Sequence, residues 1–87
     1  MALTDDLADE LARETILAME RLGNDRLYTD VAKVLGASSS TLQEAYLTSI
    51  RVRLAERRGR QFLEAAVKAF ETGSAAPVAP RESDPSH

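Results

Sequence analysis

The chain has 87 residues, no cysteine, a formal net charge of -3 and a single histidine, His87, at its last position. These facts exclude a disulfide framework, a thiolate metal site, a histidine metal cluster and a histidine-based catalytic triad. The length suits one small domain whose apolar core is thin enough to benefit from a partner subunit.

The polar character of the chain points to the cytoplasm. No apolar run approaches the roughly 20 residues of a membrane span, and the N-terminal residues lack the basic and apolar regions of a signal peptide. The negative net charge argues against a generic polyanion binder, so the distribution of charge matters more than its total.

The first predicted helix ends near Leu22, where Gly23 and the following Asn-Asp pair form a stop signal. Leu7, Leu11, Ala18 and Leu22 recur at helical spacing and are predicted to form its apolar stripe. The opposite face is rich in carboxylates: Asp9, Glu10, Glu14 and Glu20. This face is typical of a solvated surface, and it also predicts that the helix lies away from any nucleic acid.

Residues 28–47 are predicted to form two short helices joined by a tight turn. Ala32 suits a close helix crossing, and Gly36 suits a corner that requires a positive φ. Ser38 or Ser39 can cap the next helix, and Leu42 is placed to point back between the two helices. Small residue, glycine and aliphatic residue at this spacing resemble the helix-turn-helix family of bacterial DNA-binding proteins.

The resemblance implies that the start of the second short helix faces the major groove of DNA. The side chains placed outward there are Ser39, Ser40, Gln43, Glu44 and Thr48. Gln43 is suited to pair with adenine, the serines to phosphate or base edges, and Glu44 to cytosine, although its charge also repels DNA. Leu47 is expected on the same face, where it meets either a thymine methyl or a protein partner.

The segment 51–60 carries five arginines against one glutamate. Arg51, Arg53, Arg57 and Arg58 are predicted to neutralise phosphates behind the reading helix, because guanidinium groups match phosphate oxygens. The alternative is that these arginines pair with the acidic first helix, in the same chain or in a partner.

A last amphipathic helix is predicted from Phe62, Leu63, Ala66, Val67 and Phe70, either closing the core or contacting a second copy. Gly59 before it either ends the preceding helix, kinks it or is carried through. Gly73 ends the last helix, and the Pro-containing residues 74–87 are predicted to be a disordered tail.

The sequence therefore predicts an all-α domain of about four helices over residues 1–73, with no active site, metal or cofactor. The leading hypothesis is a sequence-specific DNA-binding protein, a bacterial or phage transcriptional regulator acting as a homodimer on double-stranded DNA. The first alternative is a protein-interaction module that binds a regulatory, polymerase or packaging partner through Leu47 and the last helix. The second is a purely structural helical dimer.

Overall fold

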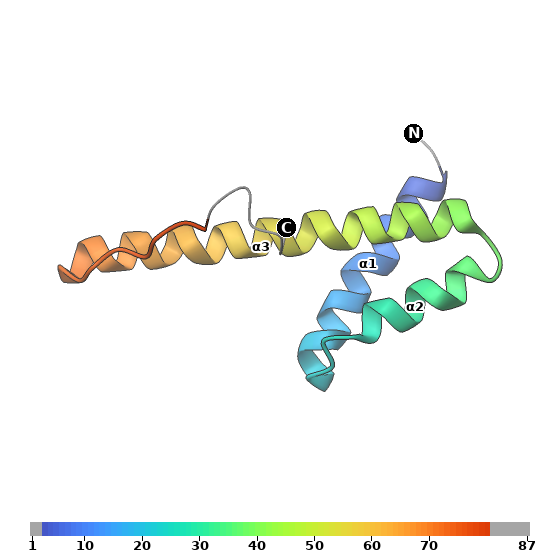
Figure 1. Cartoon of the computed structure of the whole chain (residues 1–87), viewed down its shortest axis with the longest axis horizontal. Coiled ribbons are helices and arrows are strands. Elements are labelled where there is room, and N and C mark those ends of the chain that lie inside the picture. The colour runs from blue at the N-terminus through green and yellow to red at the C-terminus, as the bar shows by residue number, and fades with distance from the viewer. Residues whose placement is uncertain (1–2, 81–87) are drawn as a thin grey trace. The chain divides into compact units, whose positions relative to one another are not determined.

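The computed structural model describes residues 3–80, and within that range the chain is all-helical. The helices are α1 (Leu3–Leu22), α2 (Leu27–Gly36) and α3 (Ser40–Thr72) (Figure 1). The chain divides into two compact units, Met1–Ala55 and Glu56–His87, here called unit 1 and unit 2. The all-α prediction is confirmed. No helix in residues 3–80 combines the length and apolarity needed to cross a bilayer.

The described residues form three helices instead of about four because α3 continues through Gly59. A glycine inside a helix costs about 1 kcal/mol relative to alanine, which is too little to break a long helix whose other residues favour it. Gly59 has no positive φ. Of the three outcomes considered for Gly59, the structure shows the one in which the helix carries it through.

Glycines end α1 and α3 as predicted. Gly23 and Gly73 have φ values of 65° and 73°, a left-handed conformation that costs glycine nothing. The backbone N–H of Asn24 donates to the carbonyl of Met19 (3.2 Å), and that of Ser74 to the carbonyl of Ala69 (2.8 Å). Both are the six-residue closure of a Schellman motif. After Gly73, residues 74–80 form neither helix nor strand, and positions 81–87 of the predicted tail lie outside the described residues.

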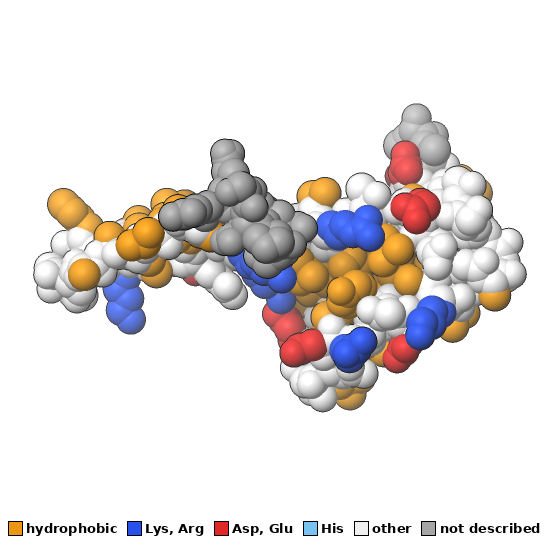
Figure 2. All heavy atoms as spheres, in the orientation of Figure 1, with side chains coloured by type: hydrophobic (Ala, Val, Ile, Leu, Met, Phe, Trp, Pro, Cys, Tyr) orange, Lys and Arg blue, Asp and Glu red, His pale blue; other side chains and the backbone are white. Residues whose placement is uncertain are grey.

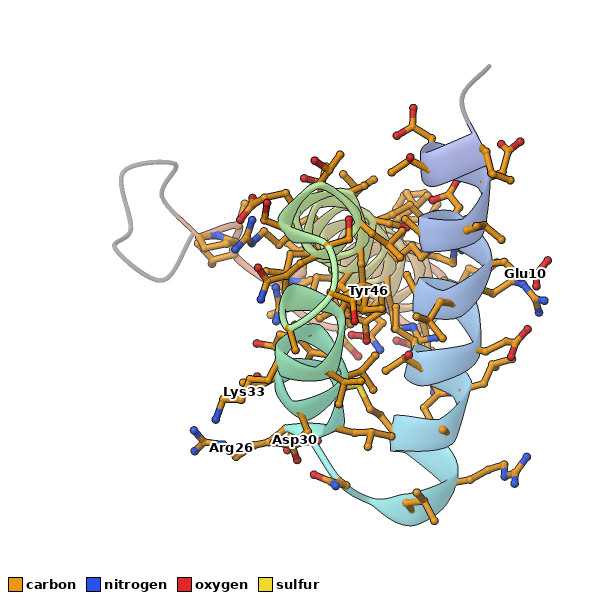
Figure 3. The ribbon with its side chains drawn as sticks, turned by 90° about the vertical axis from the view of Figure 1, so that its right-hand side faces the viewer. Glu10, Arg26, Asp30, Lys33 and Tyr46 are labelled. Atoms are coloured by element: carbon orange, nitrogen blue, oxygen red, sulfur yellow. The ribbon has the colours of Figure 1, made fainter. Side chains whose placement is uncertain are left out.

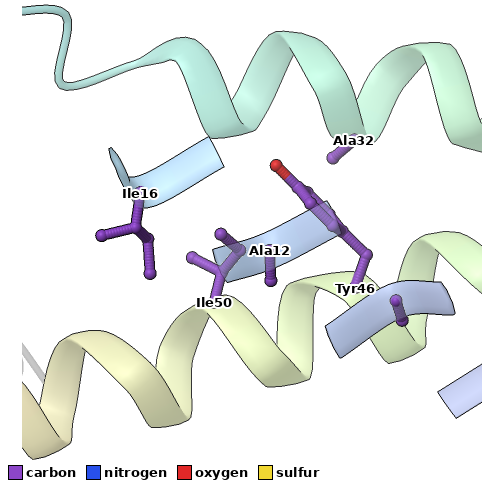
Figure 4. Close-up of a cluster of buried hydrophobic side chains, with 6 residues drawn as sticks. Ala12, Ile16, Ala32, Tyr46 and Ile50 are labelled. Atoms are coloured by element: carbon purple, nitrogen blue, oxygen red, sulfur yellow. The ribbon is translucent and has the colours of Figure 1, made fainter. Parts of the chain in front are cut away.

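The core of unit 1 lies where its three helical segments meet. Tyr46 of α3 is fully buried, and its ring rises between α1 and α2 toward Ala32 (Figures 3 and 4). The other buried apolar members of this cluster are Ala8, Ala12, Ile16, Ala32 and Ile50. Since most of the residues beside the tyrosine are alanines, helix backbones approach closely and one large side chain fills the centre.

The predicted apolar stripe of α1 is correct at Leu11, which packs on the core, and wrong at Leu7 and Leu22. Ala8 and Ala12 are buried to 1% and 0% exposure, whereas Leu7 and Leu22 are 50% and 67% exposed. The prediction rested on three- and four-residue spacing alone, which also fits a face that includes Ala8 and Ala12. The structure instead turns the alanines inward, since only small side chains leave room for Tyr46 between the helices.

Tyr46 also carries the polar link of this core. Its hydroxyl donates to the Thr15 hydroxyl at 3.0 Å, and Thr15 donates to the Leu11 carbonyl at 2.8 Å. The buried hydroxyls of Tyr46 and Thr15 therefore both have hydrogen-bond partners. Burial raises the pKa of the Tyr46 phenol, and the hydrogen bond to Thr15 opposes the rise only in part.

This raised pKa predicts a loss of stability in alkali. Above about pH 10 the phenol ionises in the unfolded chain but stays protonated in the folded one, so the unfolded state is favoured increasingly until the folded pKa is passed. We expect the urea concentration at the midpoint of unfolding, measured by circular dichroism, to fall as the pH rises above about 10. In Tyr46→Phe this fall should be smaller, and an equal fall in both proteins would contradict the assignment.

Candidate nucleic-acid interface

The corner between α2 and α3 is built from a short turn and a serine cap. After Gly36, Ala37 and Ser38 form the turn, and the Ser39 hydroxyl accepts the backbone N–H of Leu42 at 3.1 Å. This bond satisfies one of the free N–H groups at the start of α3. Of the two serines predicted as candidates for the cap, Ser39 is the one that holds it. Leu42 packs against the core cluster as predicted.

Gly36 has a different role from the one predicted. It has no positive φ and ends α2 within the right-handed helical region. A Cβ at this position would lie 2.5 Å from Nε2 of Gln43 and 2.8 Å from its Cδ. A side chain at position 36 would therefore displace the Gln43 amide from its place against α2.

Gln43 is consequently turned into the corner. Its Nε2 donates to the Ala32 carbonyl at 3.0 Å, and the side chain is half-buried. That carbonyl belongs to the last turns of α2, so Gln43 ties α3 to α2. The amide predicted to pair with adenine is occupied inside the chain. Leu47, predicted to face outward, is also half-buried and packs on the core cluster.

The outer face of the first turns of α3 is open. The exposed side chains at successive turns are Ser40, Thr41, Glu44, Thr48 and Arg51. They share one face because residues three and four apart lie on the same side of a helix. Sequence reasoning omitted Thr41, although its spacing from Glu44 and Thr48 was sufficient to include it. Neither Glu44 nor Arg51 forms an ion pair within residues 3–80.

Arg53 lies in a different environment from Arg51. Its Nε donates to the Ser49 hydroxyl at 3.2 Å, and its Nη2 lies 3.7 Å from a carboxylate oxygen of Asp9 on α1. Ser49 in turn donates to the same Asp9 oxygen at 2.6 Å. Arg53 therefore joins α3 to the acidic first helix, which is the alternative considered for the arginines. Ser49 is buried and was not predicted to have a role.

The other predicted arginines belong to unit 2. Arg57 is half-buried and Arg58 is exposed. Arg60, from the same arginine-rich segment, pairs with Glu56 one turn earlier on the helix. An exposed pair of this kind contributes little stability. Arg51 is thus the member of the predicted set that unit 1 presents on its outer surface.

A hollow of about 510 Å³ lies beside the Asp9–Ser49–Arg53 group. It is bounded by residues of α1 and α3: Asp5, Asp9, Ala45, Thr48, Ser49, Val52 and Arg53. No cluster of three His, Cys, Asp or Glu side chains suited to a metal ion occurs in the described part of the chain.

Exposed charge on α2 extends away from α1. Asp30 and Lys33 of α2 and Arg26, the residue just before it, project on that side, whereas Glu10 projects from α1 in the opposite direction (Figure 3). On the face shown in Figure 2, basic and acidic side chains both border an apolar area of unit 1. The exposed cations of α2 are therefore separated from the carboxylate of Glu10 by the body of unit 1.

The Ser39 cap gives a direct test of the corner. We expect Ser39→Ala to lower the free energy of unfolding by about 1 kcal/mol, because the N–H of Leu42 loses its acceptor. The matched control is Ser40→Ala, at an exposed neighbouring position, for which less than about 0.5 kcal/mol is expected. Urea titration monitored by circular dichroism measures both, and equal effects would contradict the assignment of the cap to Ser39.

No family model, curated protein or solved structure matches this chain.

Proposed function

We propose that unit 1 is a duplex-DNA-binding module of helix-turn-helix type, in which α2 supports α3 and the start of α3 enters the major groove. The observation that carries the proposal is the open outer face of α3 at Ser40, Glu44, Thr48 and Arg51. The spacing of Ala32, Gly36 and Leu42 supports it, because Ala32 is buried beside Tyr46 and Leu42 packs beneath the corner. We infer a role in transcriptional regulation, as in the repressors and activators that dock on DNA through such a module.

The outward side chains divide by the groups that they recognise. The hydroxyls of Ser40, Thr41 and Thr48 donate to base edges or phosphate oxygens, and Glu44 accepts from the amino group of cytosine. Arg51 binds a phosphate or the acceptor edge of guanine. Gln43 acts as a positioning residue, because its hydrogen bond to Ala32 fixes the angle at which α3 leaves α2.

Backbone contacts come from exposed cations beside the outer face of α3. Arg26 at the N-cap of α2 and Lys33 on α2 extend on the side away from Glu10, where these two cations outnumber the single carboxylate of Asp30 (Figure 3). Phosphate neutralisation supplies most of the binding energy in such complexes through the release of counterions. The negative net charge of the chain is compatible with this arrangement because the acidic α1 face turns outward elsewhere.

The alternative function is a protein-interaction module with the same fold and no DNA surface. Two side chains that were predicted to contact DNA favour this alternative. Gln43 and Arg53 are both engaged inside the chain, by the Ala32 carbonyl and the Asp9 carboxylate. Exposed apolar side chains also favour it, with Val34 and Val52 at 71% and 62% exposure. In this case α2 and α3 bind a larger regulatory, polymerase or packaging protein.

Selection of duplex DNA from a random pool, followed by binding measurements at several salt concentrations, separates the two functions. The DNA-binding function predicts an enriched sequence and an affinity that falls linearly on a log–log plot against salt. An enriched sequence is required because phosphate contacts alone do not discriminate among duplexes. No enrichment together with no measurable binding at low salt would reject DNA binding and favour the protein-interaction module.

A further inference from the structure

The part of α3 that belongs to unit 2 has an apolar face with no charged residue on it. Gly59, Leu63, Ala66 and Phe70 follow one another at spacings of four, three and four residues, which keeps them on one side of a helix. Leu63 is 61% exposed and Phe70 is 88% exposed, with Val67 beside them at 48%. We call the four residues at these spacings, Gly59, Leu63, Ala66 and Phe70, the seam.

Gly59 on the seam has no explanation within one copy of the chain. Its φ is not positive, and a Cβ built on it would meet no atom within 4 Å. An alanine would therefore fit there and would favour the helix more. A helix glycine permits the closest approach of a group from outside the chain, because it has no side chain at that point.

We propose that the seam binds the seam of a second copy of this chain, with the two helices antiparallel. Along the seam, small and large residues alternate: Gly59, Leu63, Ala66, Phe70. When one helix is reversed about its midpoint between Glu64 and Ala65, Phe70 of one copy falls opposite Gly59 of the other, and Leu63 falls opposite Ala66. Each large side chain then enters the space left by a small one, which is the condition for close helix packing. A parallel pair would place Phe70 against Phe70 and leave a gap at Gly59.

The charges of unit 2 favour the same orientation. Its helix begins with three arginines and one glutamate, at positions 56–60, and continues with Glu64, Lys68 and Glu71. An antiparallel pair places the basic start of each helix beside the more acidic end of the other, and a parallel pair places the two basic starts together. This inference goes beyond DNA binding and does not depend on it, because the seam lies wholly in unit 2.

Sedimentation equilibrium of the full chain and its variants tests the proposal. The wild type should be a reversible dimer. Gly59→Leu should weaken self-association at least about tenfold, because it fills the space that the partner's Phe70 occupies, and Phe70→Ala should do the same by removing that side chain. The double variant Gly59→Leu with Phe70→Ala should regain dimerisation, because it exchanges large and small at two positions that face each other only in the antiparallel pair.

Val34→Ser is the matched control, since Val34 is an exposed apolar residue of α2 in unit 1. It should leave self-association unchanged, and circular dichroism should show that every variant keeps its helix content. A wild type that remains monomeric at all concentrations would overturn the proposal and leave the seam for a different protein. A dimer unaffected by Gly59→Leu would overturn it as well, and a double variant no better than the two single ones would overturn the antiparallel arrangement. None of these results would bear on DNA binding by unit 1.

Discussion

Replacing Tyr46 with alanine should lower the free energy of unfolding by about 3–5 kcal/mol, the range for an aromatic side chain removed from a packed core. Tyr46 is fully buried at the meeting point of α1, α2 and α3, so each helix loses contacts with the ring. The alanines around it are too short to fill the cavity. A domain of this size has a total stability of about 4–13 kcal/mol, so unit 1 should unfold in little urea.

Two controls separate the loss of the ring from other effects of Tyr46→Ala. Tyr46→Phe keeps the ring and removes only the bond to Thr15, which should cost about 0.5–1.5 kcal/mol. Val34→Ala truncates an exposed side chain and should cost less than about 0.5 kcal/mol. Urea unfolding followed by circular dichroism gives all three values. If Tyr46→Ala cost no more than Tyr46→Phe, the ring would not be the centre of the core.

The elements of the fold were largely accessible from sequence because their signals are local. Gly23 and Gly73 end helices through their own φ values, and Ser39 caps α3 through a bond to a residue three positions away. The inward face of α1 was not accessible in the same way. Whether Leu7 or Ala8 faces the core depends on Tyr46, which is distant in sequence, and periodicity does not contain that information.

In the candidate site, too, local features were predictable from sequence and contacts between helices were not. The exposed positions Ser40, Glu44, Thr48 and Arg51 follow from helical spacing alone. The positions of Gln43 and Arg53 depend on partners in other helices, the Ala32 carbonyl and the Asp9 carboxylate. From helical spacing alone, a polar side chain at the edge of a helix face is predicted to point into solvent. A carbonyl or carboxylate within reach turns it inward, and only the packed structure reveals that neighbour.

The largest effect expected on DNA binding is that of Arg51→Ala. Arg51 is exposed on the outer face of α3 and has no ion-pair partner within residues 3–80. If its guanidinium neutralises one phosphate, its removal should lower the slope of log affinity against log salt by about one and weaken binding about tenfold near 0.1 M salt.

Arg53→Ala is the matched control for Arg51→Ala, two residues away on the same helix. The Arg53 guanidinium is engaged by Asp9 and Ser49, so its loss should leave the salt slope nearly unchanged. Fluorescence anisotropy with the selected duplex, at several salt concentrations, measures both slopes. Equal slopes for wild type and Arg51→Ala, or a larger change for Arg53→Ala, would contradict the placement of the DNA surface on the outer face of α3. Both variants remove one positive charge from α3. A difference between their slopes of log affinity against log salt therefore reports which of the two positions lies against the DNA.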